Sequence, residues 1–411
     1  AGRSVVVVRG ELGRAGPGTP AGRAAFAAVA RAMREMGRQF VLGESIEAGL
    51  ARARSREAEG YTYSYDMLGE AAMTRADAER YRASYSHAIK AIGAVATHPS
   101  VAENPGISIK LSALHPRYEM AQRDRVLAEL VPVVRALARQ AAACGIGLNI
   151  DAEEAARLDL SLDVIEAVAR DRELDGWNGF GVVVQAYGLR ASSVIDWIAT
   201  LARQTGRQMM VRLVKGAYWD TEIKHAQEQG FDGYPVFTRK SATDISYLAC
   251  ARQLLDLRDV IYPQFATHNA HTVAAVVEMA GGANGYEFQR LHGMGQGLHD
   301  VLRASAGTRC RIYAPVGAHK DLLAYLVRRL LENGANSSFV NQIVDTSVPA
   351  EHVAADPVAA IVPGKSPVRK PRDLFGEKRR NSQGWDLRNV DDLAAIETAR
   401  GPYRAVKWDV A

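Results

Sequence analysis

Cysteine is scarce in this 411-residue chain, which has three, at Cys144, Cys250 and Cys310. Such an odd, widely spaced set predicts neither a disulfide framework nor a zinc site, and indicates reduced cysteines. Long apolar runs are also missing: none reaches the ~18 residues of a membrane helix, and Val5–Val8 is too short for the apolar region of a signal peptide. We therefore expect a cytoplasmic protein, with any membrane contact peripheral, at the inner membrane.

The excess of positive charge is small and local. The net charge is +5 at pH 7, and much of it lies in residues 365–372 and 378–380. Neither run contains interleaved aromatic residues or a recognisable DNA-binding motif, so we expect no nucleic-acid partner. Gly293–Gly297 is glycine-rich, but it is not a Gly-x-Gly-x-x-Gly motif that opens a βαβ unit. A Rossmann-type dinucleotide site is therefore not expected.

One arrangement recurs eight times along the chain, a short apolar, β-prone run that ends in a charged or hydrogen-bonding residue. The runs are separated by roughly 20 to 50 residues of mostly helical pattern, which is the period of a βα unit. Eight such units predict an α/β protein with a (βα)8 barrel, whose chemistry lies where strands end and loops begin. The runs are 61–68 (followed by Glu70), 107–111, 148–151, 181–185, 209–215, 263–268, 286–292 and 311–315.

Polar side chains share one face of these predicted strands. Because strand side chains alternate between faces, Ser108 and Lys110 point away from Ile107, Ile109 and Leu111. A single buried lysine is also consistent with a structural ion pair. Convergence from several strands is harder to explain by packing, since each buried polar group must be matched, and it indicates a charged ligand rich in acceptors. The other converging residues are Asp151, Gln185, Arg212 and Tyr313.

The last predicted helix, Lys320–Asn333 closed by Gly334, carries paired arginines. Two guanidinium groups side by side suit a carboxylate or a phosphate. The same pattern is typical of a solvated helix surface, and the spacing alone leaves both interpretations open. The residues that share this face are Tyr325, Arg328, Arg329 and Glu332.

Histidines near the sixth and seventh runs favour a second interpretation, a metal-dependent barrel hydrolase. His268 ends a predicted strand, whereas His271 lies in the helix that follows, and His292 comes one unit later. No strand-end carboxylate is obviously left over as a bridging ligand, so we expect no metal. A non-catalytic interaction module is a further alternative.

Apolar spacing and composition divide the chain into three regions. Residues 23–58 have helical spacing, and the sequence after Asp345 becomes proline-rich and charged. We expect a helical arm in residues 1–60, the barrel in 61–350 and an irregular linker or tail in 351–411.

Long stretches of the sequence resemble a known family, the proline dehydrogenase domain of bacterial proline utilization A, from about Arg38 to Ala350. The resemblance implies a distorted (βα)8 barrel that holds FAD and oxidises L-proline to Δ1-pyrroline-5-carboxylate, the first step of proline catabolism to glutamate. Hydride would pass from proline C5 to the flavin N5, and electrons would pass on to ubiquinone or another membrane quinone. The stretches are Ser108–Ala113, Arg212–Trp219, Ala266–Asn269 and Tyr325–Gly334.

The resemblance also implies a continuation of the chain. Bifunctional members carry an aldehyde dehydrogenase domain after the barrel, and Pro371–Gly376 and Arg379–Ser382 resemble the linker into it. We expect that domain in the full-length protein, and we interpret this chain as an excised or engineered portion of a longer polypeptide.

Roles at the substrate follow from the resemblance. Arg328, Arg329 and Lys110 would clamp the proline carboxylate. Asp151 would orient Lys110 and Tyr313, and Glu70 would pair with Arg328 as a gate. The residues expected to wall the pyrrolidine ring are Tyr218, Leu291, Tyr313 and Tyr325.

Roles at the flavin follow in the same way. Gln185 and Arg212 would reach the isoalloxazine edge, where a cation stabilises the anionic reduced ring, with Asp151 beside them. Gly216 would allow close backbone approach. Val214 and Trp219 would also line the cofactor, and its pyrophosphate, ribose and adenine contacts are expected from Lys240, Thr267, His268, Gln289 and Glu332.

Overall fold

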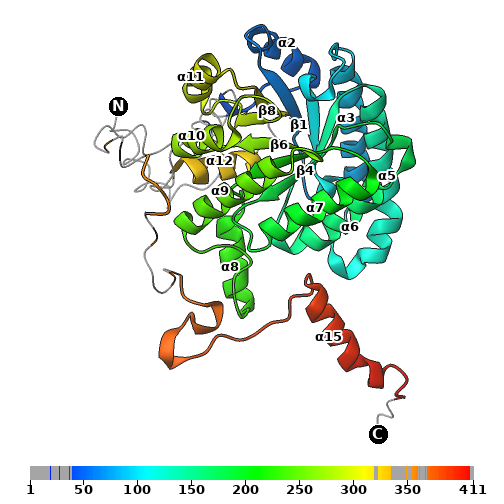
Figure 1. Ribbon diagram of the computed structural model, residues 1–411. Helices are drawn as coiled ribbons and strands as arrows, with labels where there is room; N and C mark the ends of the chain where they lie inside the picture. The colour runs from blue at the N-terminus through cyan, green and yellow to red at the C-terminus, as the bar shows by residue number, and fades with distance from the viewer. Residues whose placement is uncertain are drawn as a thin grey trace.

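The computed structural model describes residues 39–318, 323–334, 354–359 and 368–407, the isolated positions 19, 27, 37, 349, 351, 361 and 366, and within 323–334 the side chains of 324–329. Eight parallel strands close into a barrel in chain order, with β8 beside β1 (Figure 1). This confirms the predicted (βα)8 barrel. The strands are β1 (Thr62–Met67), β2 (Gly106–Ile109), β3 (Gly147–Ile150), β4 (Phe180–Gln185), β5 (Met209–Val214), β6 (Ile261–Ala266), β7 (Glu287–Leu291) and β8 (Cys310–Val316).

The interior of the barrel is polar, as the alternation of the strands predicts. The hydroxyls of Ser64 and Ser108 lie 3.1 Å apart on β1 and β2. Across the barrel, the Asn149 side-chain amide on β3 donates to Gln264 on β6 at 2.9 Å. The residues between them, such as Ile107, belong instead to the main hydrophobic core, which the surrounding helices share. One face of each strand therefore builds the core and the other lines the barrel.

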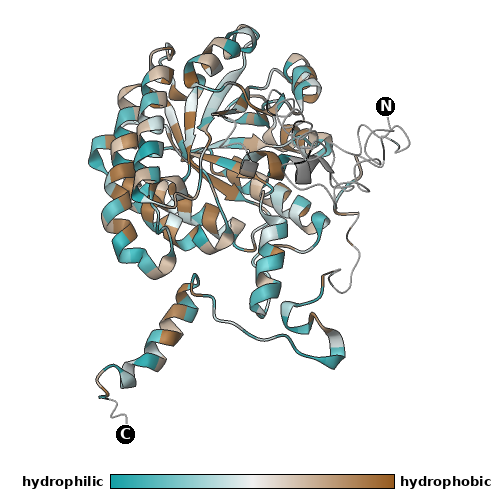
Figure 2. Ribbon diagram, turned by 180° about the vertical axis from the view of Figure 1, so that it is seen from behind, coloured by the Kyte–Doolittle hydropathy of each residue, from teal (hydrophilic) through white to brown (hydrophobic). Residues whose placement is uncertain are grey.

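Helices cover the barrel because each has an apolar face. In α5 (Arg123–Ala143), Val126, Leu130, Val134 and Leu137 recur at three- and four-residue spacing and are buried. Burying one such side chain contributes about 1.5 to 3 kcal/mol. Figure 2 shows hydrophilic and hydrophobic positions alternating along the outer helices. The other helices between strands are α3 (Arg75–Gly93), α4 (Leu111–Leu114), α6 (Leu158–Ala169), α7 (Ala191–Thr205), α8 (Trp219–Gln229), α9 (Lys240–Asp256), α10 (Ala270–Ala280) and α11 (Gln296–Ala306).

The chain before the barrel packs against the end of β8. The Leu42 N–H donates to the Pro315 carbonyl at 2.8 Å, and α2 (Ile46–Glu57) follows. Almost all of residues 23–38, the first part of the predicted arm, lie outside the described residues. A small apolar cluster joins this segment to the helix after β8, α12 (Leu323–Gly334). Its members are Phe40, Val41, Leu68, Met294, Tyr325 and Leu326, with Leu291 and Tyr313 packed against them.

The first part of the C-terminal segment 368–407 lies beside α8, and α15 extends away from it (Figure 1). The Gly384 N–H donates to the Gln229 carbonyl at 2.6 Å, and the Asn381 side chain donates to the Gln227 carbonyl at 2.7 Å. The prediction of a wholly irregular tail is wrong at α15 (Val390–Arg400). The Asn389 side chain accepts a hydrogen bond from the Asp391 N–H and so satisfies a donor at the start of this helix.

Candidate active site

Lys110 follows directly on β2 and is one of the two cations of a group that we call the strand-end cluster: Asp66, Lys110, Asp151, Arg212 and Tyr313. The Lys110 Nζ lies 2.9 Å from each carboxylate oxygen of Asp66 and 3.3 Å from Asp151 Oδ2. Its side chain is 7% exposed. Burial opposes the charge, but Asp66, Tyr313 and Asp151 together hold the pKa of Lys110 well above its ordinary value. Lys110 is therefore a fixed positive charge.

Asp151 connects Arg212 to Tyr313 within the strand-end cluster. Arg212 Nη1 donates to Asp151 Oδ1 at 2.9 Å, and the Tyr313 hydroxyl donates to Asp151 Oδ2 at 2.7 Å. The guanidinium carbon of Arg212 lies 5.1 Å from the centre of the Tyr313 ring. Arg212 also donates to the side-chain oxygens of Gln289, Ser64 and Ser108, at 2.6, 3.1 and 3.0 Å. Residues predicted from β3, β5, β7 and β8 are thus in contact.

Glu70 and Arg328 form a bidentate ion pair between the loop after β1 and α12. The two guanidinium nitrogens lie 2.8 and 2.9 Å from the carboxylate oxygens. Burial opposes the charge on Glu70, but the hydrogen bonds from Arg328 outweigh it and lower the pKa of Glu70. The Arg328 guanidinium also lies over the Tyr218 ring, 5.2 Å from its centre. The structure contains the predicted pairing, whereas its role as a gate stays a prediction.

Tyr325 and Arg329 lie together on α12 and are both buried. The Arg329 guanidinium carbon is 5.2 Å from the centre of the Tyr325 ring. Tyr325 packs in the small apolar cluster, where Leu291 and Tyr313 meet it. Side chains from β7, β8 and α12 therefore combine an apolar wall with cationic groups. The solvated-surface interpretation of this helix face is wrong at these two positions.

The residues predicted to line the flavin follow β4 and β5. The Gln185 side-chain amide donates to the Glu153 carbonyl at 2.8 Å, which fixes its direction. Val214 ends β5, and Gly216 follows with φ +129. A Cβ atom on Gly216 would lie 2.5 Å from the Tyr187 ring, so only glycine fits this backbone. Trp219 opens α8, where its indole N–H donates to the Phe237 carbonyl at 2.8 Å.

The remaining predicted cofactor contacts are more scattered. Thr267 and His268 follow β6, and the His268 Nε2 accepts the Leu291 N–H at 3.0 Å. Lys240 is not in contact with the strand-end cluster: it starts α9 and pairs with Asp244 at 2.6 Å, and Asp244 also binds Lys215. The Glu332 side chain lies outside the described residues.

Asp66 is a site residue that the sequence analysis missed. It lies in β1, is 0% exposed, and binds Lys110 with both oxygens. Its register partner on β2 is Ser108, the residue two before Lys110. Applying the alternation rule to β1 would have placed Ser64 and Asp66 on the inner face. The sequence analysis assigned Glu70, which follows this strand, as the polar residue of the first unit instead.

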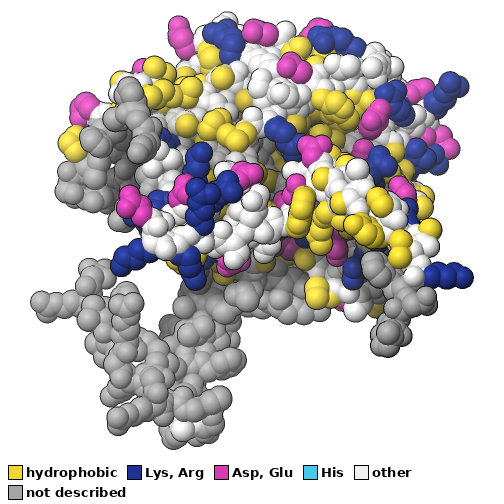
Figure 3. Space-filling view, turned by 90° about the horizontal axis from the view of Figure 1, so that it is seen from below, with side chains coloured by type: hydrophobic (Ala, Val, Ile, Leu, Met, Phe, Trp, Pro, Cys, Tyr) yellow, Lys and Arg dark blue, Asp and Glu magenta, His cyan; other side chains and the backbone are white. Residues whose placement is uncertain are grey.

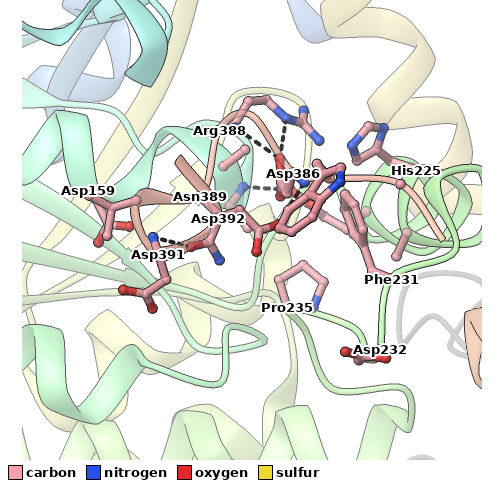
Figure 4. Close-up of a pocket in the computed structure, with 18 of the residues that line it drawn as sticks. Asp159, His225, Phe231, Asp232, Pro235, Asp386, Arg388, Asn389, Asp391 and Asp392 are labelled. Atoms are coloured by element: carbon pink, nitrogen blue, oxygen red, sulfur yellow. Dashed lines mark hydrogen bonds and ion pairs between the residues drawn. The ribbon is translucent and has the colours of Figure 1, made fainter. Parts of the chain in front are cut away.

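The cavities formed by the described residues include two that lie outside the barrel interior. One of about 270 Å³ is bounded by β3, β4, α6 and α7 and is lined in part by Asp151, Glu153 and Gln185, so it borders the strand-end cluster. The other, of about 810 Å³, lies between α8 and the C-terminal segment (Figure 4). Its wall carries several acidic residues and contains none of the strand-end residues, so we do not assign the active site there. The labelled acidic residues are Asp159, Asp232, Asp386, Asp391 and Asp392.

Surface charge, helix length and the grouping of His, Cys, Asp and Glu side chains bear on membrane and metal binding. In Figure 3, basic and acidic side chains are interspersed on the face shown. Within the described ranges, no helix is long and apolar enough to cross a membrane. Nor do three or more His, Cys, Asp or Glu side chains gather as a metal-binding group in this part of the chain.

Comparison with known proteins identifies relatives of the whole barrel. A family model described as "Proline dehydrogenase" matches residues 49–342. The bifunctional protein PutA of Salmonella typhimurium is 54% identical over 92% of this chain, which covers 30% of that protein. The proline dehydrogenase of Deinococcus radiodurans is 28% identical over 75% of this chain and 90% of its own length. The chain thus spans about a third of the length of its bifunctional relatives.

Comparison with solved structures points to the same family. A crystal structure of a Bradyrhizobium japonicum proline utilization A variant matches with a TM-score of 0.84 and 53% identity, over 95% of this chain and 40% of that one. Proline utilization A from Bdellovibrio bacteriovorus matches with a TM-score of 0.85 and 28% identity, over 94% of this chain and 41% of that one. By its sequence and by its barrel, the chain belongs to the proline dehydrogenase family.

Proposed function

We propose that this chain is a FAD-dependent proline dehydrogenase that oxidises L-proline to Δ1-pyrroline-5-carboxylate, the first step of proline conversion to glutamate. The observation that carries the proposal is the meeting of Lys110, Tyr313, Arg328 and Arg329 at the mouth of a barrel of this family. We assign catalysis to about residues 61–350, with 1–60 as an arm and 351–411 as a linker or tail.

The substrate carboxylate is bound by cations from two sides. Arg328 and Arg329 offer planar forks from α12, and Lys110 offers an ammonium from the end of β2. Three donors with formal charge favour a carboxylate over a neutral ring substituent, because only an anion gains charge-assisted hydrogen bonds from all three. The clamp therefore selects a cyclic amino acid over a cyclic amine.

Apolar and aromatic side chains hold the pyrrolidine ring. Leu291 and Tyr313 pack against the cluster that contains Tyr325, and Tyr218 lies beneath Arg328. This wall orients the ring for reaction at C5 and excludes water from it. Burial and the neighbouring carboxylates of Asp151 and Asp66 keep the pKa of Tyr313 well above its ordinary value, so Tyr313 stays protonated and acts as a donor.

The residues present fit a flavin. Gln185 and Arg212 provide donors for the ring edge, with Asp151 holding Arg212. Gly216, which the Tyr187 ring keeps free of a side chain, would present its backbone to the ring after β5. FAD, when bound, supplies at its N5 the acceptor for the hydride that leaves proline C5. The other residues that would hold it are Val214, Trp219, Lys240, Thr267, His268, Gln289 and Glu332.

The ion pair of Glu70 and Arg328 closes the site. It joins the loop after β1 to α12, which follows the neighbouring strand β8, so its formation ties these two segments together at the barrel mouth. Closure of this kind sequesters substrate from water and completes the binding constellation. Opening the pair releases product without disturbing the flavin contacts.

Partners beyond proline follow from the family. Electrons leave for ubiquinone or another membrane quinone, which requires peripheral contact with a membrane surface. An aldehyde dehydrogenase domain is expected in the full-length protein, since the relatives named bifunctional PutA extend well beyond the matched part.

Anaerobic mixing with substrate tests the proposal. Protein reconstituted with FAD should be yellow, and L-proline should bleach the visible flavin bands and yield a product that o-aminobenzaldehyde traps. D-proline and pyrrolidine serve as controls, since one has the wrong configuration and the other lacks the carboxylate. Failure to bind FAD, or equal bleaching by pyrrolidine, would contradict the proposal.

A further inference from the structure

Asp66 occupies a particular place in the barrel: it is a carboxylate enclosed by protein directly beneath the substrate clamp. It lies on β1 with 0% of its surface exposed, and both oxygens are 2.9 Å from Lys110 Nζ. Among the proposed clamp cations, Lys110 is the one held from the barrel interior, whereas Arg328 and Arg329 come from α12. Asp66 thus meets the clamp from the side opposite to the helix.

The contacts of the Lys110 ammonium differ in strength. Both oxygens of Asp66 lie 2.9 Å from the Lys110 Nζ, so one of the three ammonium hydrogens is shared between them. The contacts to Asp151 Oδ2 at 3.3 Å and to the Tyr313 hydroxyl at 3.5 Å are longer. A substrate carboxylate therefore competes for these two weaker contacts, while Asp66 fixes the nitrogen from behind.

We propose that Asp66 is a positioning residue of the substrate site: it anchors the Lys110 ammonium and keeps it charged, so that Lys110 can bind the substrate carboxylate. This inference rests on the proposed function. Asp66 itself does not touch substrate.

The physical reason is the cost of burying a lone ammonium. Burial alone lowers the pKa of a lysine, and Asp66 makes the largest opposing contribution at Lys110. Asp151 compensates only in part, because it also binds Arg212 and Tyr313. The charged and titratable groups that face Lys110 from the packed elements are Asp66, Tyr85, Asp151 and Tyr313, with Glu70 and Tyr218 farther out.

A purely structural ion pair would have a different consequence. Loss of a purely structural pair would lower carboxylate affinity by the same factor at every pH. Loss of an anchor that keeps Lys110 charged makes carboxylate binding depend on pH. Binding is retained below the lowered pKa of Lys110 and is lost as pH rises through it, by up to about tenfold per pH unit for one proton.

The experiment measures binding of cyclopentanecarboxylate to the FAD-loaded protein by calorimetry, from about pH 6 to about pH 10, where this ligand stays anionic. It has no amine to titrate and is not oxidised. In the wild type, the dissociation constant should be flat across most of this range. In Asp66→Asn, an isosteric change, it should rise steadily with pH, and Asp66→Glu should restore the flat profile.

A double variant tests whether the pH dependence of binding comes from Lys110. Asp66→Asn combined with Lys110→Met should bind weakly but without the pH dependence. If Asp66→Asn does not fold, Asp66→Ser leaves room for formate, which should flatten the profile when added. A flat profile in a folded Asp66→Asn or formate-free Asp66→Ser would overturn the inference and leave the proposed function standing. Failure of the wild type to bind the ligand at all would overturn both.

Discussion

Arg311 and Lys110 are both buried cations inside the barrel, yet they are held in different ways. Arg311 Nε lies 2.7 Å from Glu287, and its Nη atoms also donate to main-chain carbonyls, of Tyr63, Asn104 and Ala102, at 3.2, 2.8 and 2.7 Å. The Lys110 ammonium contacts the side chains of Asp66, Asp151 and Tyr313. Main-chain carbonyls cannot rotate away from Arg311, whereas a ligand can displace a side-chain partner of Lys110.

The difference follows from depth along the strands. Arg311 and Tyr313 are two residues apart on the inner face of β8, and sequence alternation treats them alike. Arg311 lies near the start of the strand, where it binds Glu287 and the floor of the barrel, whereas Tyr313 lies beside β7 residue Leu291. In (βα)8 barrels the amino ends of strands provide stability and the carboxyl ends provide chemistry. Position, more than residue type, separates the two roles.

The largest expected effect comes from removing Arg311, which binds Glu287 at the amino end of the barrel. Arg311→Met leaves Glu287 buried without its counterion, and should lower the free energy of unfolding by about 3 to 5 kcal/mol. Thermal and urea unfolding measure it. The double variant with Glu287→Gln should recover much of the loss. If Arg311→Met unfolds like the wild type but loses proline binding, the assignment of stability to the amino end of the barrel and of binding to the carboxyl end is wrong.

A change at the mouth should move binding instead. Arg329→Met removes one arm of the carboxylate clamp and should weaken proline binding by about 2 to 4 kcal/mol, with flavin content unchanged. Steady-state kinetics and flavin quantification measure the two effects. Arg328→Lys, which keeps a charge but loses the bidentate fork, is the graded control. Unchanged affinity for proline in Arg329→Met would remove α12 from the site.

The gate should give the smallest effect. Glu70→Ala frees Arg328 from its partner, and should weaken productive proline binding by about 1 kcal/mol because the pair is partly exposed. Flavin content should stay intact, and Glu70→Asp should fall between the two. Loss of flavin would show that Glu70 supports the cofactor rather than closure.

The wild-type gate also has a predicted pH dependence. Since the folded-state pKa of Glu70 is depressed, the pair persists above the ordinary carboxylate range and is lost only as pH falls through the lowered value. A stopped-flow measurement of substrate binding should therefore show no change in gate behaviour between neutral pH and about pH 5. A transition within that range, absent from Glu70→Gln, would contradict the ion pair.

The sequence predicts the barrel well because strand alternation and βα period are local properties. All eight strands begin and end within two residues of the runs that predicted them. The contacts of Lys110, Asp151 and Tyr313 were also within reach, because strands in a closed parallel barrel share one carboxyl end.

Other features depend on packing that no local pattern encodes. The alternation rule puts Asp66 on the inner face of β1, but its pairing with Lys110 depends on the register of β1 against β2. The role of Lys240 at the cofactor stays a prediction, because its pairing with Asp244, one helical turn away, does not test it. The helix α15 follows a proline-rich, charged stretch, and its apolar face is too weak to predict it.

The most direct test of the account is a crystal structure of the FAD-loaded protein with cyclopentanecarboxylate bound. The ligand carboxylate should contact Lys110, Arg328 and Arg329, with Asp66 still on Lys110 and every contact of Arg311 unchanged. A carboxylate bound away from these three cations, or a rearranged Arg311, would contradict the claim that side-chain-held cations at the strand ends form the substrate site.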